Sequence, residues 1–270
     1  MICLDNYILC QTQRAEKPFY LSSIRMNIYS IEELCYFLVN NLYLADGEVF
    51  NENLAVWLEQ ELMLPRLAKT LRPKFGKFAD IQDLIYPVLK EINYLTYDEM
   101  KQLNAAIQTY HSETPSMRAR RKGDMLAANG ILVSAIQVYQ ELLARIKKAE
   151  PGKDLPESDF MLVPVLYHNL GCAFARLFQM EKAAECFYEA YRWTGKGSDL
   201  TTYLLAYRSI KTPLEYQSRI AELGCEEEVK NSIQQKIEGF RRKPEPQVYT
   251  RDIDEILTKL TEEYHRSTAS

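Results

Sequence analysis

His168 and Cys172 are the two side chains whose types and spacing come nearest to catalytic chemistry in this chain. They are about one helical turn apart, so on a helix they would share a face, where an imidazole can activate a thiol as a nucleophile. Such a pair needs a third group that orients the imidazole, and a zinc site needs about four ligands at recognisable spacing. The sequence has no HExxH motif and no CxxC pair. We therefore predict that both residues line or pack a surface, and that the chain is neither an enzyme nor dependent on a cofactor.

A second candidate is the densest basic cluster, which contains Arg118, Arg120, Arg121 and Lys122. It fits an anion-facing patch that recognises an acidic or carboxylate-bearing segment, although the solvated face of a helix is the commoner origin of such a cluster. The stretch from Gly195 to Gly197 lacks the spacing of a phosphate-binding loop, so we predict a turn there.

Composition limits the class of protein. The chain has 270 residues, a formal net charge of -4 and only 10 glycines, with many good helix formers. These values favour a mostly helical globular protein and argue against general binding of nucleic acid. No apolar run is long enough to span a membrane, and the six cysteines are dispersed. We predict a cytoplasmic protein with reduced thiols that binds neither membrane nor nucleic acid.

The N-terminal third should combine a short hairpin with helices. Residues 7–10 and 19–29 have β-branched and aromatic side chains in partial alternation, and the polar residues 11–18 between them predict a connecting turn. Ser30 and Glu33 form a capping box, and Thr96 caps a later helix. Pro87 predicts a kink or a break. The expected helices cover 31–42, 51–61, 64–71, 80–93 and 97–111.

A spaced pattern of small and large residues then occurs twice in one register. In the second copy the pattern comprises Tyr167, Leu170, Gly171, Phe174, Ala183, Phe187 and Ala190. In the first copy it comprises Gly123, Gly130, Ala135, Tyr139 and Leu142. Small residues permit two helices to cross closely, and large ones fill the space between helices. Residues 116–197 thereby resemble a pair of tetratricopeptide repeats, the helix–turn–helix units of about 34 residues. Further helices are expected at 200–210, 213–223, 227–240 and 251–265.

The resemblance implies a mostly all-α fold: a tetratricopeptide-like α–α superhelix with a small N-terminal helical or α+β module. It also implies a non-catalytic adaptor that binds a protein or peptide, with an acidic segment, in the groove lined by the first helix of each repeat. Some family members clamp a carboxylate there, and Asp124 departs from that pattern because it would repel one. The groove positions that we predict as partner contacts are Arg120, Arg121, Asp124, His168, Asn169, Cys172 and Arg176.

We expect three parts: an N-terminal module at 1–112, the repeat array at 113–243, and a linker with a last helix at 244–270. Two alternatives come from other classes. The N-terminal module could be a regulatory or enzymatic domain that carries the repeats as an interaction arm. The last amphipathic helix could instead dock on a second copy and make a structural homo-oligomer.

Overall fold

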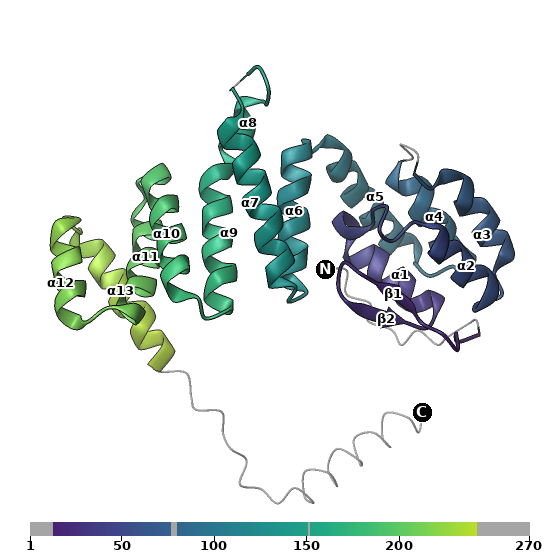
Figure 1. Cartoon of the computed structure of the whole chain (residues 1–270), viewed down its shortest axis with the longest axis horizontal. Helices are drawn as coiled ribbons and strands as arrows, with labels where there is room; N and C mark the ends of the chain where they lie inside the picture. Colours follow the sequence, from purple (N-terminus) through teal and green to yellow (C-terminus); the bar gives the residue numbers. More distant parts are fainter. Residues whose placement is uncertain (1–12, 77–79, 151, 242–270) are drawn as a thin grey trace, which may run out of the picture. The chain divides into compact units, whose positions relative to one another are not determined.

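The computed structural model describes residues 13–76, 80–150 and 152–241, which are mostly helical with one two-stranded hairpin (Figure 1). This confirms the mostly all-α class. The first elements are β1 (Phe19–Leu21), β2 (Met26–Ile28), α1 (Ile31–Asn40), the 3-10 helix η1 (Leu42–Leu44), α2 (Glu52–Gln60), α3 (Pro65–Leu71), the 3-10 helix η2 (Arg72–Lys74), α4 (Ile81–Glu91) and α5 (Tyr97–Ser112). The later ones are α6 (Pro115–Ala128), α7 (Leu132–Lys148), α8 (Glu157–Phe160), α9 (Leu162–Arg176), α10 (Met180–Thr194), α11 (Gly197–Ile210), α12 (Pro213–Glu222) and α13 (Glu227–Arg241).

One compact unit extends to Tyr216, and a second begins at Gln217. The three-part division stays a prediction. The strand expected at 7–10 and the helix expected at 251–265 both lie outside the described residues.

The hairpin lies at a different place in the sequence from the one that we predicted. Strands β1 and β2 both lie within 19–29, pair antiparallel with Phe19 opposite Ile28, and are joined by residues 22–25. The polar segment 11–18 is therefore not the turn of this hairpin. Arg25, with φ of 53°, supplies the left-handed backbone that the tight connection needs. Phe19 packs its ring at 5.6 Å from that of Trp57 in α2, so the hairpin rests on a helix.

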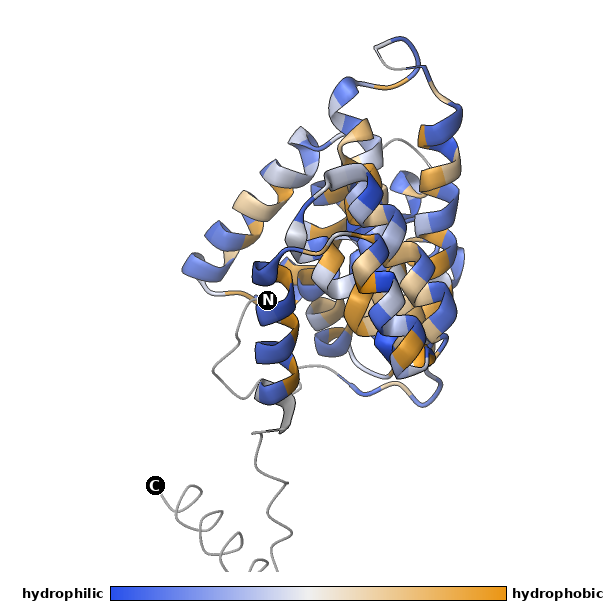
Figure 2. Cartoon of the chain, turned by 90° about the vertical axis from the view of Figure 1, so that its left-hand side faces the viewer, coloured by the Kyte–Doolittle hydropathy of each residue, from blue (hydrophilic) through white to orange (hydrophobic). Residues whose placement is uncertain are grey.

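The predicted helix starts in the N-terminal part are confirmed. Ser30 with Glu33, and Thr96 with Glu99, each form a reciprocal capping box that satisfies backbone N–H groups at the start of α1 and α5. Helix α1 then buries Leu34 and Leu38 completely. In Figure 2 hydrophobic residues follow one side of several helices, as amphipathic packing requires.

Pro87 predicted a kink or a break; helix α4 continues through this residue, so no break occurs there. A proline inside a helix removes the hydrogen bond to the carbonyl four residues earlier, which here belongs to Asp83. The Lys74 Nζ donates a hydrogen bond of 2.8 Å to that carbonyl oxygen. The orphaned acceptor is thereby satisfied from η2, and the buried residues Ile85 and Val88 hold the helix on both sides of the proline.

Helices α6 and α7, and helices α9 and α10, cross through equivalent contacts. An added Cβ at Gly123 would meet the ring of Tyr139 at 2.4 Å, and one at Gly171 would meet the ring of Phe187 at 2.5 Å. Only glycine lets the helices approach so closely. The C-cap of α10 is Gly195 with φ of 64°, which confirms the predicted turn.

The N-terminal elements and α6 are joined by side-chain bonds within the first unit. Lys122 Nζ lies 2.7 Å from Asp46 Oδ2, and Asn129 Nδ2 donates to Asn41 Oδ1 at 2.7 Å. Both partners flank η1, which packs against α6. Helix α6 is thus covered on this side by the N-terminal elements.

Candidate functional site

Helices α6 and α9 bring three of the predicted contact residues into one polar network. The carboxylate of Asp124 accepts two hydrogen bonds of 2.7 Å on Oδ1, from the Tyr139 hydroxyl and from Asn169 Nδ2. The Nε of Arg120 lies 3.8 Å from the other oxygen, Oδ2. Burial, and then the hydrogen bond to Asp124, raise the pKa of the Tyr139 hydroxyl. The network therefore ties α6, α7 and α9 together through one carboxylate.

This network gives Asp124 a role that the sequence did not predict. Its charge faces Arg120 and two neutral donors, so the repulsion expected for a bound carboxylate is partly compensated. Asn169, which we predicted as a donor to a ligand, already donates to Asp124. Arg120, Asp124 and Asn169 thus interact with one another, and their contact with a partner stays a prediction.

Within the described residues, His168 and Cys172 both lie on α9 but lack the hydrogen bond through which an imidazole activates a thiol. The His168 ring packs against Phe187 with centroids 5.5 Å apart, and no hydrogen bond links it to the Cys172 thiol. Cys172 is a free, exposed cysteine. Desolvation raises the pKa of its thiol, and the charge of Arg176 opposes that shift only in part. A raised thiol pKa lowers the fraction of reactive thiolate, which is the opposite of what a nucleophile needs.

The remaining predicted contacts also have partners within the chain. Arg121 Nε donates to Glu113 Oε1 at 3.2 Å, and the Tyr43 hydroxyl donates to Glu113 Oε2 at 2.8 Å. Burial, and then this hydrogen bond, raise the pKa of Tyr43 to about 12. Arg176 Nη1 donates to the Ala127 carbonyl at 2.6 Å, which satisfies an acceptor in the last turn of α6.

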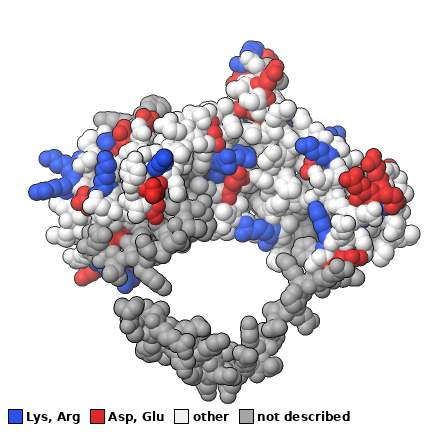
Figure 3. All heavy atoms as spheres, turned by 180° about the vertical axis from the view of Figure 1, so that it is seen from behind, with Lys and Arg blue, Asp and Glu red and all other residues white. Residues whose placement is uncertain are grey.

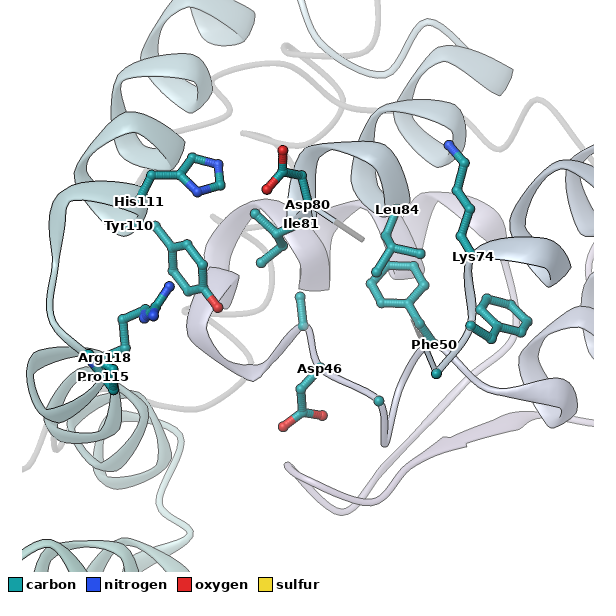
Figure 4. Close-up of a pocket in the computed structure, with 14 residues that line it drawn as sticks. Asp46, Phe50, Lys74, Asp80, Ile81, Leu84, Tyr110, His111, Pro115 and Arg118 are labelled. Carbon is teal, nitrogen blue, oxygen red and sulfur yellow. The ribbon is translucent and has the colours of Figure 1, made fainter. Parts of the chain in front are cut away.

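A cavity of about 650 Å³ lies between lining residues within 45–50, 74–76 and 80–84 on one hand and the α5–α6 corner on the other (Figure 4). Figure 4 shows Tyr110, His111 and Arg118 on one side, with Phe50 and Leu84 opposite them. No pattern in the sequence indicated this cavity, because its lining comes from segments far apart in the chain. The one sequence feature that pointed to this region was the basic cluster, because its member Arg118 lines the cavity.

The charged surface is mixed. On the face in Figure 3, basic and acidic side chains are interspersed, without one broad field of a single sign. Across the described ranges, no group of three or more His, Cys, Asp or Glu side chains is placed to hold a metal ion. Among the helices that the structure describes, none combines the length and the apolar composition needed to cross a membrane.

Comparison of the chain with protein-family models, with curated proteins and with solved structures found no match. A functional assignment therefore depends on the geometry of these helices and of their side chains.

Proposed function

We propose that residues 116–197 form a tetratricopeptide-like array and that the protein is a non-catalytic adaptor for a peptide or protein partner. The observation that carries this proposal is the repeated crossing contact. Gly123 meets Tyr139 and Gly171 meets Phe187 at the same separation along the chain. Ala135 and Ala183, at matching positions, are both fully buried. One helix pair of this kind cannot bury its apolar face alone, so stacked pairs make an extended binding surface.

The face proposed for binding is shared by α6 and α9. Its exposed side chains include Arg121 on α6 and Val165, Cys172 and Arg176 on α9. The half-buried network around Asp124 lies beside them and supplies polar groups. A mixed surface of this type suits a peptide that has both apolar side chains and carboxylates.

Two cations on this face can still reach a ligand while they keep their internal bonds. Arg121 is exposed although it pairs with Glu113, and Arg176 uses one nitrogen on the Ala127 carbonyl. A guanidinium has five N–H donors, so donors remain for a carboxylate on a partner. His168 and Asn169 contribute at the edges of the same face in this proposal.

The test uses peptides selected from a display library by the immobilised full chain, with affinities then measured by fluorescence anisotropy. The variant Val165→Glu/Cys172→Glu adds two carboxylates to the proposed face. The control Val133→Glu/Gln137→Glu makes the same change of charge at exposed positions of α7. Circular dichroism checks that both variants keep the helix content of the parent chain.

We expect the α9 variant to bind the selected peptides at least roughly tenfold more weakly, and the α7 variant to bind them like the parent chain. Selection of no peptide above a blank surface would contradict the adaptor function. Equal binding by both variants would remove the α6–α9 face as its site.

A further inference from the structure

The cavity between the N-terminal elements and the α5–α6 corner is the feature that the adaptor face does not use. Its volume of about 650 Å³ falls within the range of pockets that hold a ligand. Phe50, Phe75 and Leu84 supply apolar lining, and Figure 4 shows Phe50 and Leu84, with Lys74 beside them, opposite Tyr110, His111 and Arg118. Apolar lining that faces polar side chains favours a ligand that has both apolar and polar groups.

Arg118 differs from the rest of its basic cluster. Arg121 pairs with Glu113, Lys122 pairs with Asp46, and Arg120 lies near Asp124. Within the described residues, no hydrogen bond or ion pair engages the side chain of Arg118, and its guanidinium carbon lies 5.1 Å from the centroid of the Tyr110 ring. Stacking on a ring face fixes the plane of the guanidinium but leaves its N–H donors available. A planar set of donors at the edge of a cavity matches a carboxylate in two-point geometry.

The acidic side chains of the lining decide how the ligand must lie. The charge of Asp46 is balanced by Lys122 at 2.7 Å. Asp80 is the N-cap residue of α4, but its side chain caps no backbone N–H group. A ligand carboxylate is therefore attracted to the Arg118 wall and repelled by Asp80, while apolar atoms suit the space beside Phe50 and Leu84.

We propose that this cavity binds a peptide segment in which an aromatic or large aliphatic side chain stands next to a carboxylate. The apolar side chain fills the part beside Phe50 and Leu84, and the carboxylate pairs with Arg118. The site deepens the adaptor function and rests on it for the class of partner, but it is separate from the α6–α9 face.

The experiment uses the full chain and short fluorescein-labelled peptides that carry a Phe-Glu pair, with Phe-Lys peptides as the reversed-charge probe. Arg118→Glu is compared with Arg66→Glu, which makes the same change of charge at an exposed position of α3 that does not line the cavity. Arg118→Gln removes the charge alone and serves if the glutamate variant does not fold. Asp80→Asn removes the opposing carboxylate.

We expect Arg118→Glu to weaken binding of the Phe-Glu peptide by roughly tenfold or more, with Arg66→Glu close to the parent chain. Asp80→Asn should tighten binding roughly threefold. Equal affinity for the Phe-Glu and Phe-Lys peptides, or no effect of either Arg118 variant, would overturn the cavity as the site.

The same peptides separate this inference from the proposed function. Loss of binding in Val165→Glu/Cys172→Glu, without loss in the Arg118 variants, would overturn the cavity and support the α6–α9 face. Loss in the Arg118 variants alone would support the cavity and remove the α6–α9 face as the site. If display-selected peptides bind but no Phe-Glu peptide does, the cavity fails while the adaptor function stands.

Discussion

Replacing Gly171 by alanine tests the crossing contact on which the repeat interpretation depends. The new Cβ would lie 2.5 Å from a ring carbon of Phe187, where ordinary contacts begin near 3.4 Å. That ring is almost fully buried and also packs against His168, so it cannot simply swing away. Overpacking of this kind costs about 1–3 kcal/mol, whereas alanine is about 1 kcal/mol better than glycine inside a helix. We expect a net loss of about 1 kcal/mol in the free energy of unfolding.

Gly123→Ala should lower the free energy of unfolding by more than Gly171→Ala does. The ring that it would meet, that of Tyr139, lies at 2.4 Å and is also fixed by its hydroxyl bond to Asp124. Gly239→Ala in α13 is the matched control, because nothing lies within 4 Å of an added Cβ there. That change should only increase the helix content.

Urea unfolding followed by circular dichroism measures these effects, with constant m-values as the check on cooperativity. The variant Phe187→Leu completes a double-mutant cycle, because removing the ring should remove most of the cost of Gly171→Ala. A Gly171→Ala protein as stable as the parent, or a cycle with coupling below about 0.5 kcal/mol, would refute the close-crossing argument.

Three further predictions concern the polar network and the buried groups. Asp124→Ala should lower the free energy of unfolding by about 2 kcal/mol, because a buried tyrosine hydroxyl loses its acceptor. Asn169→Ala should lower it by about 1 kcal/mol. If the two losses measured by urea unfolding simply add in the double variant, the residues do not share a network. The neutral Tyr43 binds its proton more tightly in the folded state, so its contribution to stability is complete below about pH 10 and is lost as pH rises through about 12. Tyr43→Phe should flatten that loss in unfolding measured across this range, and an unchanged pH profile would count against it. With a thiol reagent, the exposed Cys172 should react faster than the buried Cys35, since burial strongly raises the pKa of the Cys35 thiol and blocks access to it. Cys172→Ser should therefore remove more of the early reaction than Cys35→Ser, and the reverse order would show that the surroundings of Cys35 open readily.

The helices could be predicted because their signals are local. A capping box such as that of Ser30 and Glu33 satisfies backbone groups within one turn, and Gly195 supplies the left-handed conformation that ends α10. The small residues Gly123 and Gly171 likewise mark close crossings, because a Cβ at either position would overlap an aromatic ring. These signals depend on neighbours in the chain or on size alone.

The intact α4 and the cavity depend on contacts between segments that are separated in the sequence. Lys74 reaches the carbonyl that Pro87 leaves without a donor, and no spacing rule foretells that bond. In the same way, the sequence predicted a basic cluster but could not say which of its members lack an acidic partner. Asp46 and Glu113 pair with Lys122 and Arg121, whereas the Arg118 side chain lies beside a cavity with no acidic partner among the residues that the structure describes.

The sequence by itself determined the helical class, the helix ends and the close crossings of helices, because these follow from the size, hydrogen-bonding capacity and backbone freedom of each residue. Only the tertiary structure decided which charges are paired and where space remains. An ion pair or a cavity needs side chains from several elements at distances of a few ångströms, and packing sets those distances.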